Sequence, residues 1–128
     1  MKDIQREEMS YDVVIVGAGP AGLSAAIKLK QINSDISICL LEKAAEVGAH
    51  ILSGNVFETK ALDELIPNWK DLNAPVKTKV TSEDFLYLNK EKSFKVPNFL
   101  LPKSLQNHGN YIISLSNLCK WLGEFAEN

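Results

Sequence analysis

A glycine-rich segment directly after a β-branched run constrains the fold of this 128-residue chain more than any other feature. The run Val13–Val16 is apolar at every position, which is typical of a parallel strand buried on both faces. The sequence GAGPAG follows at residues 17–22, and Pro20 suits the first turn of a helix, where an N–H is not needed. Apolar residues then recur at helical spacing, so we predict a helix to about Gln31.

A second apolar run completes a repeating pattern. The polar residues 33–35 interrupt the helix, and a strand is predicted from Ile36 to Leu41, ending at Glu42. A strand, glycine-rich turn, helix and second strand within about 32 residues have the size of one βαβ unit. We therefore predict an α/β, Rossmann-like fold.

Each glycine of the turn has a physical reason to be there. Gly17 permits the tight turn out of the strand, Gly19 lets the backbone approach a diphosphate, and Gly22 lets the helix pack near the strand. The start of the helix then offers free N–H donors and a partial positive charge. This arrangement predicts a dinucleotide-binding site.

Glu42 lies 20 residues after Gly22 and supplies an acid at the end of the second strand. A carboxylate at that place accepts hydrogen bonds from ribose hydroxyls and repels a 2′-phosphate, which argues against NADP. The alternative is a glycine-rich turn with no ligand. The strand before the motif, the helix after it and the acid at this distance favour the binding site.

FAD is preferred over NAD because the motif lies at the start of the chain, as is usual in flavoproteins, and because a loop of small residues follows Glu42. That loop, residues 48–54, would let the backbone come near the cofactor; its alternative is an ordinary small-residue loop. The predicted cofactor-binding residues are Gly17, Ala18, Gly19, Pro20, Ala21, Gly22, Glu42, Lys43, Gly48, Ala49, Ser53 and Gly54.

The remaining sequence predicts short elements. A helix is expected over Lys60–Ile66 with Thr59 as N-cap, and a β-hairpin over residues 84–96. Short strands are expected over residues 75–80 and 111–114, an apolar loop over 97–102, and a last helix over 117–127. We interpret residues 1–10 as a flexible arm and 11–128 as the N-terminal part of an FAD-binding domain that is incomplete, with a small hairpin insertion.

Several functional classes are disfavoured by composition. The net charge is −2 without a polybasic run, so nucleic-acid binding is not expected. Cys39 and Cys119 lie far apart without a Cys or His cluster, so they predict core thiols rather than metal ligands. His50 and His108 have no partner placed by the sequence, so loop or structural roles are preferred. No targeting segment or transmembrane run is evident.

Particular segments resemble known families. YDVVIVGAGPAGLSAAIKL at residues 11–29 resembles glutathione-reductase-like FAD proteins in general. Five further segments are similar to the N-terminal part of the electron transfer flavoprotein–ubiquinone oxidoreductase family: LEKAAEVGAHILSG at 41–54, ALDELIPNW at 61–69, AP at 74–75, NHGNY at 107–111 and LCKWLGEFAE at 118–127. The fold class implied is a glutathione-reductase-type FAD domain.

This resemblance implies a parent enzyme with FAD and one [4Fe–4S] cluster, which takes electrons from reduced electron transfer flavoprotein and passes them to ubiquinone. The cluster ligands would lie beyond Asn128, and the fragment alone would be inactive. No catalytic side chain is assigned, because the cofactors exchange the electrons. The implied location is monotopic, on the cytoplasmic face of a bacterial inner membrane or, in a eukaryote, on the mitochondrial inner membrane.

Several alternatives remain open. The parent could be another membrane-associated flavoprotein, geranylgeranyl-reductase-like or FixC-like, or the chain could be a non-catalytic FAD-binding remnant.

Broader flavin hydroxylase relatives often carry an FAD-holding Arg where this chain has Ser114, and we favour Ser114 as a helix cap. Peripheral membrane contact is expected through Val47–Trp69, with Phe99–Leu101 as a second stretch; core packing is the alternative for both.

Overall fold

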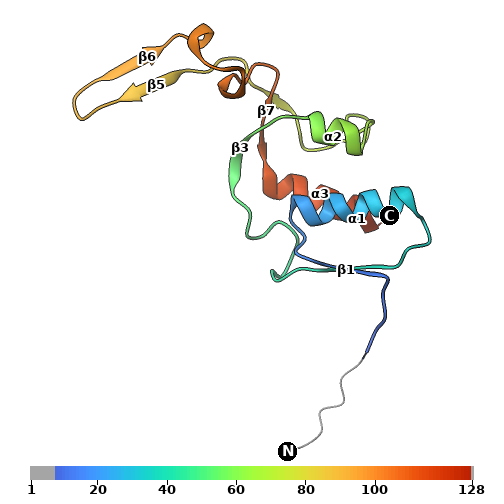
Figure 1. Ribbon diagram of the computed structural model, residues 1–128. Helices are drawn as coiled ribbons and strands as arrows, with labels where there is room; N and C mark the ends of the chain where they lie inside the picture. The colour runs from blue at the N-terminus through green and yellow to red at the C-terminus, as the bar shows by residue number, and fades with distance from the viewer. Residues whose placement is uncertain (1–7, 128) are drawn as a thin grey trace, which may run out of the picture. The chain divides into compact units, whose positions relative to one another are not determined.

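The computed structural model describes residues 8–127, so residues 1–7 of the arm predicted over residues 1–10 lie outside the described part. The described chain divides into two compact units. Unit 1 contains the residues up to Ile51 together with those from Cys119 onward, and unit 2 contains Leu52–Leu118. Figure 1 shows the course of the chain through both units.

Unit 1 contains the predicted βαβ unit. Strand β1 (Val13–Val16) is followed by helix α1 (Pro20–Ile32) and strand β2 (Ile38–Leu41). The two strands are parallel, with register from Val13↔Ile38 to Val16↔Leu41. The predicted strand–helix–strand order is therefore confirmed, and β2 begins two residues later than expected.

Hydrogen bonds between Asp12 and Ser37 connect the two chain segments that precede β1 and β2. The Asp12 carboxylate accepts hydrogen bonds from the Ser37 backbone N–H at 2.8 Å and from its hydroxyl at 2.6 Å. The Ser37 hydroxyl oxygen accepts the Asp12 N–H at 2.9 Å. These bonds hold the pKa of Asp12 below its ordinary value.

The prediction that β1 is buried on both faces is wrong. Ile15 faces α1, since its side chain lies beside Gly22 of that helix. On the opposite face Val14 is 55% exposed and Val16 is 83% exposed. In the described residues this sheet has two strands, β1 and β2, and α1 covers the face to which Ile15 belongs.

Unit 2 is built on an antiparallel sheet of order β3-β7-β4. A separate hairpin pairs β5 with β6, and two short 3-10 turns, η1 and η2, follow it. The last helix, α3, begins directly after β7. The bounds are β3 (Ser53–Phe57), α2 (Lys60–Leu65), β4 (Thr78–Lys79), β5 (Phe85–Leu88), β6 (Ser93–Val96), η1 (Asn98–Leu100), η2 (Lys103–Leu105), β7 (Tyr111–Ser114) and α3 (Leu115–Glu127).

Strand β3 was not predicted, because residues 48–54 were interpreted as one loop. The strand depends on pairing with β7, which lies more than 50 residues later in the sequence and pairs Val56 with Ile112. The register shifts between Ser53 and Asn55, so Gly54 is the additional residue of a β-bulge. Its φ of 79° is the left-handed conformation that favours glycine in such bulges.

Trp69 belongs to the interior of unit 2. It is 3% exposed, and its indole N–H donates to the Asp63 carboxylate at 2.7 Å. Its ring meets Tyr111 edge to face, with centroids 6.1 Å apart. The apolar residues of the α2 region, Leu62 and Ile66, are buried as well. Core packing, the alternative given for the stretch Val47–Trp69, therefore accounts for these three side chains.

The hairpin carries apolar side chains on its surface. The opposite pairs Phe85↔Val96 and Tyr87↔Phe94 share one face, because directly paired residues of antiparallel strands point the same way. Figure 1 shows the hairpin extending from the rest of unit 2.

The turns after the hairpin are fixed by polar contacts. The Glu83 carboxylate accepts the backbone N–H and the side-chain N–H of Asn107. The Gln106 amide donates to the Leu101 carbonyl at 2.9 Å. The apolar loop predicted at 97–102 is thus held in place, while its residues Phe99 and Leu100 are 81% and 65% exposed.

Candidate functional site

The form of the glycine-rich turn depends on the conformation and the packing of its glycines. Gly17 has φ of 104°, a conformation that side-chain-bearing residues rarely adopt. A β-carbon on Gly22 would lie 2.0 Å from the Gly17 carbonyl oxygen, so no larger residue fits there. The turn therefore depends on these two glycines for its form.

Gly19, in contrast, is not required by the fold. Its φ is −81°, which any residue can adopt, and a β-carbon built there would have no other heavy atom within 4 Å among the described residues. The fold itself would thus accept a side chain at this position. The open space beside Gly19 is where a ligand can approach the backbone, which fits the predicted diphosphate.

The start of α1 presents backbone amides that precede the first hydrogen bond within the helix. The first amide bonded within the helix is that of Leu23, which donates to the Gly19 carbonyl at 3.0 Å. The amides of Ala21 and Gly22 precede it, and the first turn contains no acidic residue. Free donors and the helix dipole together favour an anion at this end of a 13-residue helix.

Glu42 joins the turn to the loop after β2. One of its carboxylate oxygens accepts the Ala18 N–H at 2.8 Å, and the other accepts the Ala44 N–H at 2.8 Å. The pKa of Glu42 is lowered by the Ala44 and then the Ala18 hydrogen bond, with a smaller contribution from the charge of His50. The exposed carboxylate is therefore held in its charged form beside the turn.

The predicted cofactor-binding residues are divided between the two units. The turn residues 17–22, Glu42 and Lys43 lie at the carboxyl end of the β1–β2 sheet, and Gly48 and Ala49 follow in the same unit. Gly48 is buried with φ of 85°, whereas Ala49 is exposed. Ser53 and Gly54 begin β3 of unit 2, so the prediction that they are loop residues is wrong.

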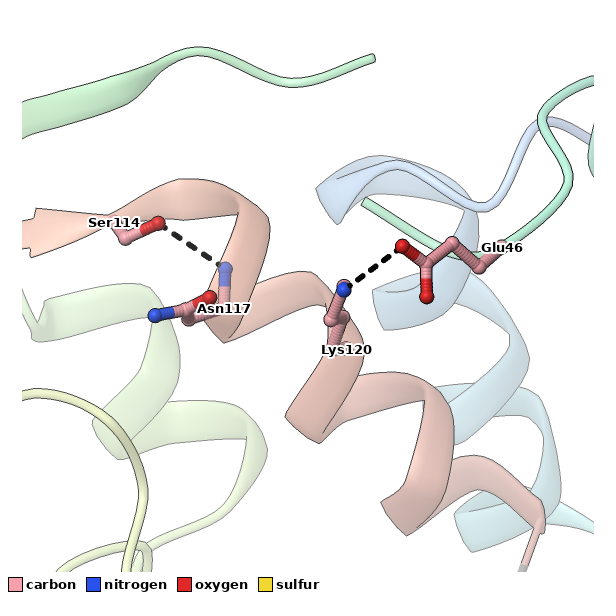
Figure 2. Close-up of polar contacts among 4 residues, drawn as sticks. All are labelled: Glu46, Ser114, Asn117 and Lys120. Carbon is pink, nitrogen blue, oxygen red and sulfur yellow. Dashed lines mark hydrogen bonds and ion pairs between the residues drawn. The ribbon is translucent and has the colours of Figure 1, made fainter. Parts of the chain in front are cut away.

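The sequence did not reveal how the loop after Glu42 is held. Lys120 of α3 forms an ion pair with Glu46 at 3.1 Å, and Figure 2 shows these two side chains facing each other. Gly123 of the same helix lies beside Val47, since a β-carbon added to Gly123 would be 3.6 Å from a methyl carbon of Val47. No local signal predicts contacts between residues more than 70 positions apart.

Ser114 caps α3, as favoured from the sequence. Its hydroxyl oxygen accepts the Asn117 N–H at 3.4 Å (Figure 2), the bond that an N-cap side chain makes to the third helical residue. The helix accordingly begins two residues earlier than predicted.

A cavity of about 830 Å³ in unit 1 adjoins this site. Glu42 and Lys30 are among its polar lining residues. The apolar lining comes from α1, β2 and α3, and includes Leu23, Ile27, Leu40, Val47 and Phe125. A largely apolar cavity with the Glu42 and Glu127 carboxylates on its wall is suited to an organic ligand rather than to a bare ion.

Metal binding and membrane spanning have no structural support within residues 8–127. No group of three or more His, Cys, Asp or Glu side chains there could hold a metal ion. Cys119 is fully buried, as predicted for a core thiol, and burial raises its pKa, whereas Cys39 is half-buried. None of the helices described has the length and apolar character needed to cross a membrane.

Comparison with known proteins places this site in a family context. Residues 11–110 match the family model described as "Pyridine nucleotide-disulphide oxidoreductase". A Pseudomonas aeruginosa protein named "Electron transfer flavoprotein-ubiquinone oxidoreductase" is 59% identical, over 97% of this chain and 23% of its own length. The "mitochondrial" form of that name from Arabidopsis thaliana is 55% identical, over 95% of this chain and 19% of its own length.

These relatives bear the name that the sequence motifs suggested, so that resemblance is confirmed. The chain spans about a fifth to a quarter of the length of the curated relatives it matches. The family model covers most of the chain, including the turn and Glu42, and fits the Rossmann-like βαβ unit. The chain belongs to the pyridine nucleotide-disulphide oxidoreductase family.

Proposed function

We propose that this chain is the FAD-binding N-terminal portion of an electron transfer flavoprotein–ubiquinone oxidoreductase, with a fold of glutathione-reductase type. The observation that carries the proposal is the open backbone at Gly19 beside the free amides of α1, with the Glu42 carboxylate at the end of β2. The names of the relatives favour this enzyme over the geranylgeranyl-reductase-like and FixC-like alternatives.

Different residues of the site would hold different parts of the cofactor's ADP half. The amides of Ala21 and Gly22 would hold the diphosphate, and Glu42 would accept the ribose hydroxyls. Lys43, Gly48 and Ala49 would lie along the cofactor, and the same role is proposed for Ser53 and Gly54. The flavin supplies electron transfer when bound, and this chain's residues bind and orient it.

The partners proposed for the parent protein are those in the relatives' name: electron transfer flavoprotein as donor and ubiquinone as acceptor. The parent's [4Fe–4S] cluster is proposed to have its ligands outside this chain, since no metal-ligand group is present among residues 8–127. We derive no step through the cluster. Half a flavin site cannot by itself connect donor to acceptor, so the fragment alone is proposed to be inactive.

A binding experiment tests the cofactor assignment. The purified chain is titrated with FAD, ADP and FMN by isothermal titration calorimetry. FAD and ADP should bind in a 1:1 ratio, and FMN, which lacks the ADP half, should bind at least about tenfold more weakly. Equal binding of FMN and FAD, or no binding of either FAD or ADP, would contradict the proposal.

Peripheral membrane contact is proposed through exposed apolar side chains. Trp69 and Ile66 are buried, so within Val47–Trp69 the available residues are Leu52 and Val56, and Phe99 and Leu100 are exposed in the second stretch. The proposed location of the parent remains monotopic, on the cytoplasmic face of a bacterial inner membrane or on the mitochondrial inner membrane.

Vesicle flotation tests this contact. Changing Phe99 and Leu100 together to Ser should lower the bound fraction by about tenfold or more, since each buried apolar side chain contributes ~1.5–3 kcal/mol. Ile32→Ser, at an exposed apolar position on α1 in unit 1, is the matched control and should bind like the wild type. An equal loss in the control, or none in the double variant, would contradict this contact.

A further inference from the structure

One peptide group connects Glu42 to the helix start. The Gly17–Ala18 peptide is trans, so its N–H and its carbonyl oxygen point in opposite directions. The N–H donates to Glu42 at 2.8 Å. The carbonyl oxygen lies so close to the Cα of Gly22 that a β-carbon there would be 2.0 Å away. The peptide is therefore held by a carboxylate on one side and by α1 on the other.

The Ala18 end of this peptide is buried. Ala18 is 1% exposed while the Glu42 side chain is in place, and removing the carboxylate takes away the acceptor of the Ala18 N–H. An unpaired buried donor is costly, and the peptide would rotate to find another acceptor. Rotation would move the Gly17 carbonyl away from Gly22 and change the shape of the turn. The orientation of the turn thus depends on a side chain that lies 24 residues later in the sequence.

The second Glu42 oxygen orients the other loop. It accepts the Ala44 N–H at 2.8 Å, so one carboxylate fixes both loops at the carboxyl end of the sheet. The β1–β2 pairing ends beside it with the Gly17 N–H donating to the Leu41 carbonyl at 2.7 Å. Each carboxylate oxygen has further acceptor capacity, so a ribose hydroxyl can bind without displacing these amides.

We infer that Glu42 is a positioning residue for the diphosphate-binding turn, in addition to any contact it makes with a ribose. The inference predicts that replacing Glu42 lowers the affinity even for ligands that have no ribose hydroxyls. The ligand part of the test rests on the proposed function, whereas the orientation of the two amides can be measured without a ligand.

Hydrogen exchange of the 128-residue chain tests the two amides directly. In the wild type the Ala18 and Ala44 amides should be protected near neutral pH, and this protection should fall as the Glu42 carboxylate is protonated. Glu42→Gln has one oxygen acceptor, so one of the two amides should lose protection, and in Glu42→Ala both should. Asp35→Asn, which removes an exposed carboxylate of unit 1 that precedes β2, is the matched control and should leave both amides protected.

Binding of 2′,3′-dideoxy-ADP tests the consequence for the turn. Glu42→Ala should weaken it by about tenfold, the effect of losing a hydrogen bond to a charged group. A residue that only contacts the ribose would leave the affinity for this ligand unchanged, and that result would overturn the inference. Unchanged exchange at Ala18 in both Glu42 variants would overturn it as well.

The outcomes separate the two proposals. If Glu42→Ala does not fold, as judged by lost protection of the Val13 amide at the other end of the β1–β2 sheet, Glu42→Gln and the pH dependence of the wild type still decide the inference. If neither ADP nor FAD binds, the proposed function fails, and the exchange of the two amides still supports or overturns the role of Glu42.

Discussion

Gly19 and Gly22 lie three residues apart in one motif and have different physical reasons to be glycine. Gly22 is confined by the Gly17 carbonyl oxygen, whereas the space beside Gly19 is open. The first is therefore a requirement of the fold, and for the second we propose a ligand that approaches the backbone. The sequence motif alone assigns both roles, and the structure supplies the contact that distinguishes them.

Matched alanine substitutions test this distinction. Gly22→Ala should lower the free energy of unfolding by about 1–3 kcal/mol, the range found when a side chain is forced into a packed site. Gly19→Ala should change it by less than about 0.5 kcal/mol and should still weaken FAD binding. Urea unfolding and calorimetry measure the two effects. Equal destabilisation by both variants would contradict the account of Gly19.

Asp63 provides a second residue-scale prediction. Asp63→Ala leaves the buried indole N–H of Trp69 without its acceptor and removes the partner of the Thr59 hydroxyl. The free energy of unfolding should fall by about 1–3 kcal/mol. Asp71→Ala, which removes an exposed carboxylate nearby, should change it by less than about 0.5 kcal/mol. Similar urea midpoints for Asp63→Ala and the wild type would show that the indole finds another acceptor.

At the scale of elements, the sequence predicted what local chemistry decides. β1, α1 and β2 follow from apolar periodicity and the glycine motif, and the β5–β6 hairpin follows from a polar turn between short apolar runs. β3 was missed because it depends on pairing with β7, distant in sequence. Of the strand predicted over residues 75–80, only Thr78 and Lys79 form a strand. These are the two residues that pair with β7, and this pairing is also distant in sequence.

The cap of α3 is an element whose contribution can be measured. Ser114→Ala should lower the free energy of unfolding by about 0.5–1 kcal/mol, because the Asn117 N–H loses its acceptor. Ser114→Asp retains an acceptor at the cap and should be as stable as the wild type. Thermal unfolding of the three proteins checks this. If Ser114→Ala keeps full stability, the 3.4 Å hydrogen bond contributes nothing and the interpretation as a cap is wrong.

At the scale of the whole molecule, three carboxylates among residues 8–127 have a lowered pKa and contribute to the response to acid. Hydrogen bonds lower the pKa of Asp12, Glu42 and Asp63 below their ordinary values of 3.8, 4.5 and 3.8. Each group therefore binds a proton more tightly in the unfolded chain than in the folded one. Their contribution to stability is fully present above the ordinary values and is lost as pH falls through the lowered folded values.

Urea unfolding at a series of pH values measures this response. The midpoint should be constant near neutral pH and should decrease progressively below about pH 4.5. Asp12→Asn should reduce this decrease, because one of the three shifted groups is removed. A midpoint that stays constant or rises on acidification would contradict the role assigned to these hydrogen bonds.

The candidate site was predicted in part from the sequence. The turn and Glu42 were predicted correctly as neighbours, because parallel strands bring their carboxyl ends together. The contribution of the Ala18 and Ala44 amides was not predictable, since backbone groups leave no side-chain signal. Ser53 and Gly54 lie in a strand of unit 2, and their predicted contact with a cofactor stays a prediction.

The central claim is that the start of α1 and Glu42 bind the ADP half of FAD. Titration of the ¹⁵N-labelled chain with ADP, followed by NMR, tests it most directly. The account predicts saturable shifts that are largest at the amides of residues 17–22 and 42–44. No saturable shift at these amides, or larger shifts confined to unit 2, would contradict it.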